Sequence, residues 1–282
     1  MGEISEALRR ARSGEPAAPQ GTPAERVPLP PPPAPLASSA PAAAPPQPSE
    51  HVDSPPRNRE GLWSPRALFV EDHGPAAECA RHLALRVRAE LERRKARSVA
   101  IVSALHDEGK TTVAGNRAMA LCSLSSSRSI ALVDLDLRRP SLAKALGIAP
   151  HRGIDDVATG DAQLSEACIS FDHPALDAYA VRKPHAVAHQ LLVQPQMAAA
   201  LAELERRYEV VVIDTPPVLL VPDTPILLEH IATCVAVARA GRSRSHAFQR
   251  MCAMLPPGKL IGAVLDEGRL PTDAKSYHYY EQ

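Results

Sequence analysis

The residues with the clearest chemical potential are Gly109, Lys110 and Thr111, which follow an apolar run at 98–103 and precede a segment with a helical pattern. In this arrangement glycine lets the backbone approach a phosphate, lysine reaches terminal phosphates, and the hydroxyl can bind Mg²⁺. The N–H groups and dipole at a helix start add positive potential. The triplet alone would also fit an ordinary turn with a surface lysine. The flanking strand and helix patterns favour a phosphate-binding loop.

Two further apolar runs end in carboxylates. One delivers Asp134 and Asp136, and the other ends at Asp214. Because ligands of parallel α/β sheets bind outside the carboxyl ends of the strands, we expect these side chains to converge with Lys110. Each aspartate alone could cap a helix or loop, but the three together fit a magnesium–nucleotide site better.

The elements that must position these residues alternate between strands and helices from about residue 61. The strands read as continuous apolar runs, so we predict an α/β fold of the P-loop NTPase type, with a mostly parallel sheet and helices on both faces. The predicted strands are 98–103, 129–134, 177–182, 209–214, 233–238 and 259–265, and the clearest helices are 76–93, 195–206 and 244–255.

Composition divides the chain into three parts. Fifteen of the 29 prolines lie in the first 60 residues, so 1–60 is predicted to be a disordered Pro/Ala-rich arm. The folded domain is assigned to 61–270. The remaining 271–282 is predicted to be a flexible tail, where clustered tyrosines indicate docking or modification, or else packing on the domain or a neighbouring chain.

Charge and cysteine content exclude several functional classes. Lys+Arg and Asp+Glu both number 32, so no bulk field favours nucleic acid. The five cysteines show neither a C-x-x-C pair nor zinc spacing. No apolar stretch approaches the roughly 20 residues needed to cross a bilayer, and the N-terminus does not resemble a signal peptide. These features predict a cytoplasmic protein.

Together the motifs resemble the cytoplasmic kinase domain of the bacterial tyrosine kinases (BY-kinases), a family of capsule and exopolysaccharide export systems. The resemblance covers about 67 to the C-terminus, and its most specific part is the double-aspartate motif combined with the tyrosine tail. It is carried by Glu78-x-x-Arg81, the loop 108–112 followed by Asn116, Asp134-x-Asp136-x-Arg138, Gly153-Ile-Asp-Asp-Val with Gly160, 213–217 with Asp223, and Arg239-Ala-Gly241.

The resemblance implies an ATP-dependent protein-tyrosine autokinase that regulates polysaccharide polymerisation and export. Its tail would be phosphorylated in trans within a ring-shaped homo-oligomer. The resemblance also implies a membrane-embedded activator of the chain-length-regulator type, here a separate polypeptide that recruits the chain to the inner face of the membrane, and a cognate tyrosine phosphatase. The implied autophosphorylation sites are Tyr277, Tyr279 and Tyr280, and the implied oligomerisation residues are Glu78 and Arg81.

The resemblance also implies roles for the site residues, with ATP and Mg²⁺ as cofactors. Lys110 would neutralise phosphate charge, and Thr111, Asp136 and Asp214 would hold the metal. Asp134 is the favoured base for the tyrosine proton, with Asp136 as the alternative; a phenol with a pKa of about 10 needs such help. The predicted nucleotide-binding set is Asp107, Glu108, Gly109, Lys110, Thr111, Thr112, Arg138 and Asp266.

Several positions depart from the family pattern. His106-Asp107 replaces Pro-Gly, at a place where a left-handed conformation is expected that Asp tolerates, but its carboxylate should weaken nucleotide binding. Ala84 replaces the second arginine of the oligomerisation motif, and Asp266 replaces an asparagine that reads the base. A weakly catalytic or non-catalytic nucleotide-dependent switch or scaffold of the same machinery therefore stays open. A partitioning-type ATPase is less favoured, because Leu105 stands where those proteins carry a second lysine.

Overall fold

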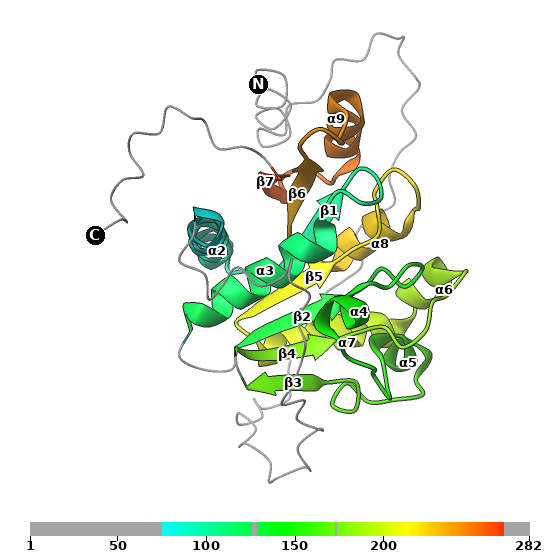
Figure 1. Cartoon of the computed structure of the whole chain (residues 1–282). Coiled ribbons are helices and arrows are strands. Elements are labelled where there is room, and N and C mark those ends of the chain that lie inside the picture. The colour runs from blue at the N-terminus through cyan, green and yellow to red at the C-terminus, as the bar shows by residue number, and fades with distance from the viewer. Residues whose placement is uncertain (1–74, 126–128, 173, 268–282) are drawn as a thin grey trace, which may run out of the picture. The chain divides into compact units, whose positions relative to one another are not determined.

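The computed structural model describes residues 75–125, 129–172 and 174–267 (Figure 1). The predicted arm at 1–60 and tail at 271–282, including its three tyrosines, lie outside the described residues. Within the described ranges no helix is both long and apolar enough to cross a membrane.

A seven-stranded sheet forms the centre of the described part, in the order β3-β4-β2-β5-β1-β6-β7. Every pairing is parallel except the antiparallel one between β3 and β4 at one edge. All residues of β1, β2 and β5 are buried, as expected for a parallel sheet covered on both faces. The strands are β1 (Ser98–Ser103), β2 (Ile130–Asp134), β3 (Ile169–Asp172), β4 (Ala175–Tyr179), β5 (Val210–Asp214), β6 (Thr233–Arg239) and β7 (Leu260–Asp266).

Helices cover both faces of this sheet, and each face has its own apolar cluster (Figure 1). One cluster contains side chains of α2 (Pro75–Arg94), α3 (Lys110–Ser123) and α4 (Leu142–Leu146). The other contains side chains of α5 (Ile154–Thr159), α6 (Ala188–Leu192), α7 (Pro195–Arg207), α8 (Asp223–His230) and α9 (Ser245–Met254). The predicted fold class is confirmed.

The predicted strands match the structure to within one or two residues at most ends. One prediction was displaced: 177–182 is the strand Ala175–Tyr179, because the chain turns away after Tyr179. Strand β3 was not predicted. It has four residues, too few for a clear periodic signal, and it pairs with β4.

Ala84, which replaces an arginine of the family pattern, belongs to the buried stripe of helix α2. The buried residues Ala77, Ala84, Val87 and Leu91 of this helix form a stripe at helical spacing, and Ala84 has no exposed surface. An arginine at this position would have to bury its guanidinium in the core. Glu78 and Arg81 lie outside this stripe and form an ion pair with each other.

Candidate functional site

The three segments that carry the carboxylates and the lysine meet at the carboxyl ends of the central strands β2, β5 and β1. Strand β5 lies between β2 and β1, and its Asp214 pairs in register with Asp134 of β2 on one side and Ile101 of β1 on the other. The loop after β1 leads directly into α3 at Lys110. The expected convergence of these strand ends is therefore present in the structure.

The loop between β1 and α3 has the backbone geometry of a phosphate cradle. Gly109, the N-cap of α3, has φ 91°, and a Cβ there would lie 2.3 Å from Asp266 Oδ2. Asp107 has φ 59°, in the left-handed region that the sequence predicted. Glu108 is buried and accepts hydrogen bonds from the Leu105 N–H at 2.7 Å and from the Ser243 hydroxyl. Glu108 therefore holds the loop in shape.

The polar side chains at the start of α3 turn back toward the strand ends. The buried Lys110 donates from Nζ to Ser103 Oγ at 3.0 Å. Thr111 Oγ1 donates to Asp214 Oδ2 at 2.5 Å and lies 2.7 Å from Ser141 Oγ. The lysine, the hydroxyl and the strand-end carboxylate thus share one small region.

The two buried aspartates differ in their surroundings. Asp134 accepts backbone N–H groups of Asp136 at 3.0 Å, Ser141 at 3.2 Å and Leu142 at 3.1 Å. Asp214 Oδ2 accepts the Thr111 hydroxyl, and the buried Oδ1 has no hydrogen-bond partner among the described residues. Backbone N–H groups thus bind both carboxylate oxygens of Asp134, whereas Oδ1 of Asp214 has no partner among the described residues.

Burial also changes the proton affinity of both acids. It raises the pKa of Asp134 well above its usual range, and the neighbouring Asp214 carboxylate raises it further. Burial raises the pKa of Asp214 to about 6, although Lys110 and the Thr111 hydroxyl oppose this shift. Negative charge at Asp214 is therefore under-compensated, and a bound cation would stabilise it.

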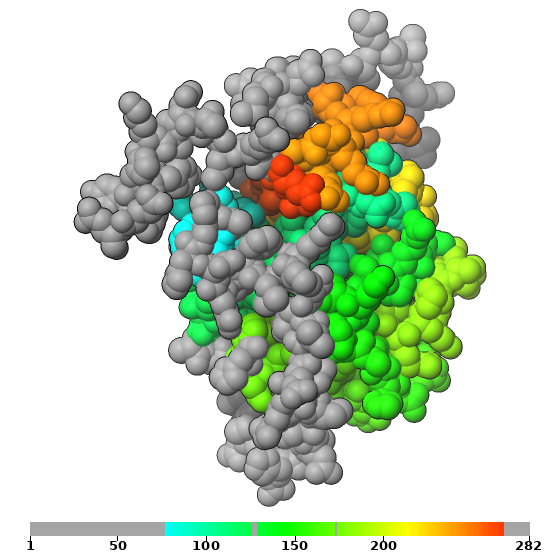
Figure 2. Space-filling view, viewed as in Figure 1, coloured from blue at the N-terminus to red at the C-terminus, as the bar shows by residue number. Residues whose placement is uncertain are grey.

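A cavity of about 370 Å³ opens beside these groups. Figure 2 shows the surface of the loop after β1 (teal) between the orange β6–α9 region and the green region that follows β2. The cavity is lined by His106, Asp107, Gly109, Lys110, Thr111, Thr112, Asp136, Arg139, Ser141 and Arg239.

Five of the predicted catalytic, nucleotide-binding and metal-binding residues do not line this cavity: Glu108, Asp134, Arg138, Asp214 and Asp266. Asp136 lines it, but Asp134, the favoured base, is fully buried and does not. Arg138 is not on the cavity wall either. Its guanidinium pairs with Asp223 at 2.6 and 3.1 Å, and the neighbouring Arg139 takes the place on the wall. A sequence pattern has little power to choose between adjacent arginines.

The remaining predicted residues lie around the loop. The Asp107 carboxylate pairs with Arg242 at 2.9 Å on the exposed side, so part of its charge is balanced. Asp266 lies against Gly109 and is not a lining residue of the cavity. Arg239 lines the cavity while pairing with Glu267, and it donates to the Asp107 carbonyl at 3.3 Å.

Some site residues were not predicted. Ser103 and Ser141 supply hydroxyls next to Lys110 and Thr111, and Arg139 supplies a cation on the cavity wall. Ser141 could have been found from sequence, because it is the N-cap of a helix that starts shortly after the double-aspartate motif.

The donor set fits Mg²⁺. The unpartnered Asp214 Oδ1 and the adjacent Thr111 hydroxyl are hard oxygen donors. In the described part of the chain, no group of three or more His, Cys, Asp or Glu side chains is arranged to hold a metal ion by itself. Mg²⁺ commonly uses one or two protein oxygens and takes its other ligands from water and phosphates.

Comparison with known proteins gives a consistent result, although no profile of a known protein family matches the chain. The chain is 28% identical to the tyrosine-protein kinase YwqD of Bacillus subtilis over 189 residues, which cover 66% of this chain and 78% of YwqD. It is 28% identical to the succinoglycan biosynthesis transport protein ExoP of Rhizobium meliloti, covering 72% of this chain but 25% of ExoP. Among solved structures, the VpsO kinase domain aligns with a TM-score of 0.60 and 26% identity, covering 69% of this chain and 96% of that domain.

Proposed function

We propose that this chain, which belongs to the bacterial tyrosine kinase family, binds Mg²⁺-ATP and transfers the γ-phosphoryl group to protein tyrosines in a capsule or exopolysaccharide system. One observation carries the proposal: Thr111, which lines the cavity together with Lys110 and Asp136, contacts the buried Asp214, whose Oδ1 has no hydrogen-bond partner among the described residues. Tyrosine is proposed as the phosphoryl acceptor because YwqD is a tyrosine-protein kinase. The polysaccharide system is proposed because ExoP is a succinoglycan biosynthesis transport protein.

The residues divide the chemistry between them. The backbone at Gly109 and the start of α3 cradle the phosphates, and Lys110 neutralises charge on the β and γ groups. Mg²⁺, held by Thr111 and Asp214, would balance charge that develops on the phosphate oxygens. The new bond forms between the phenol oxygen and the γ-phosphorus, while the bond to the β-phosphate oxygen breaks and ADP leaves.

We assign the proton-accepting role to Asp136. It lines the cavity, so an entering phenol can reach it. Asp134 accepts three backbone N–H groups and has no exposed surface, which suits a residue that fixes the turn after β2. Access from the cavity therefore supports Asp136 over Asp134 as the proposed base.

Phosphorylation of the C-terminal peptide tests the proposal directly. The full chain is incubated with Mg²⁺-ATP, with and without the cytoplasmic part of its candidate activator, and the peptide that holds Tyr277, Tyr279 and Tyr280 is analysed by mass spectrometry. Lys110→Met should abolish the label, whereas Lys144→Met, the same change at an exposed position of α4, should leave it intact. A label that survives Lys110→Met would come from a contaminant.

A second candidate is a nucleotide-dependent switch or scaffold of the same machinery. The burial of Ala84 favours it, because the stripe on α2 leaves no room for the second arginine of the oligomerisation motif. Measurable ATP binding together with unmodified tail tyrosines under both conditions would select this function over the kinase.

The family also supplies the proposed partners. We propose a membrane-embedded activator of the chain-length-regulator type that recruits the chain to the inner face of the membrane, a homo-oligomer that uses Glu78 and Arg81, and a cognate tyrosine phosphatase. The mutual ion pair of Glu78 and Arg81 on α2 would have to rearrange for either to contact a neighbouring subunit. Sedimentation of the full chain with and without the activator fragment tests the oligomer.

A further inference from the structure

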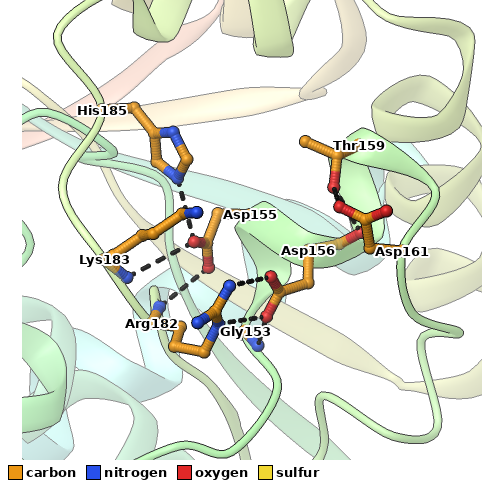
Figure 3. Close-up of polar contacts among 8 residues, drawn as sticks. All are labelled: Gly153, Asp155, Asp156, Thr159, Asp161, Arg182, Lys183 and His185. Carbon is orange, nitrogen blue, oxygen red and sulfur yellow. Dashed lines mark hydrogen bonds and ion pairs between the residues drawn. The ribbon is translucent and has the colours of Figure 1, made fainter.

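A buried carboxylate outside the cavity organises the segment 180–186, which follows β4. Asp155 lies at the start of α5 with a side chain that has no exposed surface. Its Oδ1 accepts the Arg182 N–H at 2.8 Å. Its Oδ2 accepts the Lys183 N–H at 3.3 Å and contacts His185 Nε2 at 2.9 Å (Figure 3). Within the described residues, all hydrogen-bond partners of the Asp155 carboxylate thus belong to segment 180–186.

The start of α5 is shaped to receive that segment. A Cβ on Gly153 would lie 2.5 Å from the Arg182 nitrogen and 2.2 Å from Asp155 Oδ1, so only glycine permits the close approach. The Ile154 N–H donates to the Ala180 carbonyl at 3.0 Å. Asp156 adds a second anchor, since it accepts two N–H groups of the Arg182 guanidinium at 2.7 and 2.6 Å (Figure 3).

The last residues of segment 180–186 contact the turn that follows Asp136. The His185 N–H donates to the Leu137 carbonyl at 2.7 Å. The Ala186 carbonyl accepts from the Arg138 guanidinium at 2.5 Å. Leu137 and Arg138 follow Asp136 directly, so the backbone that places Asp136 on the cavity wall is tied to this segment.

We propose that Asp155 and His185 are positioning residues for phosphoryl transfer, which set the place of Asp136 through the contact of His185 with Leu137. This proposal rests on the proposed function, because it concerns the base of that reaction. The path is a chain of direct contacts: the Asp155 carboxylate fixes the His185 ring and the preceding peptide groups, His185 fixes the Leu137 carbonyl, and that carbonyl belongs to the residue after Asp136. Neither positioning residue touches the phosphate loop.

Asp155→Asn is the first variant, because it keeps the shape of the side chain but turns one acceptor into a donor facing N–H groups. The matched control is Asp161→Asn, the same change at an exposed carboxylate just beyond α5, which accepts from the Thr159 hydroxyl and not from segment 180–186 (Figure 3). We expect Asp155→Asn to lower kcat about 10- to 100-fold, since small misplacements of reacting groups have effects of this size. The affinity for Mg²⁺-ATP should stay within about twofold of wild type, because the loop and Lys110 are untouched.

Hydrogen exchange supplies a readout that does not depend on catalysis. In Asp155→Asn the amides of 135–140 should exchange at least about tenfold faster, while amides of β1 and β5 keep their protection. Asp161→Asn should change neither region. Unchanged exchange at 135–140 overturns the proposal, and so does an equal increase across β1 and β5, which would mean a general loss of stability.

A second pair of variants keeps the test valid if Asp155→Asn folds poorly. His185→Ala should reproduce the loss of kcat and the faster exchange, and His185→Gln, which keeps a donor for Asp155, should recover most of both. Equal behaviour of the two variants overturns the proposal. If wild type binds ATP and the exchange pattern holds but no tyrosine is phosphorylated, the kinase function fails while the positioning role of Asp155 stands.

Discussion

Replacing Asp214 with asparagine should stabilise the ligand-free protein at neutral and alkaline pH. Asp214 is completely buried, its Oδ1 has no hydrogen-bond partner among the described residues, and burial raises its pKa from the ordinary 3.8 to about 6. The folded chain therefore binds a proton more tightly than the unfolded chain does. Stability that this proton provides is fully present below about pH 4 and is lost as the pH rises through 6.

The size of the effect follows from the same two values. The difference between 3.8 and about 6 corresponds to about 3 kcal/mol at a pH above both. In the variant, a weaker hydrogen bond to the Thr111 hydroxyl lowers the free energy of unfolding by about 1 kcal/mol. We therefore expect Asp214→Asn to raise the free energy of unfolding by about 2 kcal/mol at pH 8, and to raise it little or not at all at pH 4.

Urea denaturation of both chains in EDTA, at several pH values from 4 to 8, measures this difference. Asp161→Asn serves as the control, because it makes the same change at an exposed position. With Mg²⁺ and ADP at 100 times the dissociation constant, wild type should gain about 2.7 kcal/mol and the variant much less, which would reverse their order. A gap that is the same at pH 4 and pH 8 would refute the reasoning.

Three further substitutions test the architecture around the site. Gly109→Ala should destabilise the fold and weaken nucleotide binding, because of its φ of 91° and the approach to Asp266; adding Asp266→Ala should restore only the steric part, as measured by denaturation and nucleotide titration. Ala84→Arg should cost about 3 kcal/mol or more, whereas Leu85→Arg, at the exposed neighbouring position, should stay within about 0.5 kcal/mol; similar melting temperatures would contradict the burial of this stripe. Asp107→Asn should change nucleotide affinity less than about threefold, since its exposed ion pair with Arg242 is weak; a tenfold gain in calorimetry would instead support the repulsion predicted from sequence.

The parts of the fold that could be predicted are those in which local pattern and global arrangement agree. The strands ending at Asp134 and Asp214 are continuous apolar runs, and a parallel sheet brings their carboxyl ends to one edge. The Gly109-Lys110-Thr111 triplet needs only a strand before it and a helix after it. These features are short-range, so the sequence alone located the loop between β1 and α3 and the strand-end acids.

The details that the sequence could not provide depend on side-chain directions in irregular backbone. Strand β2 ends at Asp134, and the chain then turns, so the two-residue spacing to Asp136 no longer keeps both side chains on one face. The N–H groups of Ser141 and Leu142, at the start of α4, donate to Asp134, whereas Asp136 lines the cavity. Arg138 and Arg139 separate in the same way, because the partner Asp223 lies 85 residues further along the chain. No local pattern contains that contact.

The number of donors around each buried acid distinguishes architecture from ligand binding. Asp134 and Asp155 each accept two or more backbone N–H groups and so fix turns, although burial still raises the pKa of Asp134 well above its usual range. Asp214 is equally buried, but its Oδ1 has no hydrogen-bond partner among the described residues, and a bound cation would supply that partner. If this distinction is correct, replacing Asp134 or Asp155 should mainly disturb the backbone that they hold. Replacing Asp214 should leave that backbone in place and remove the response to Mg²⁺-nucleotide.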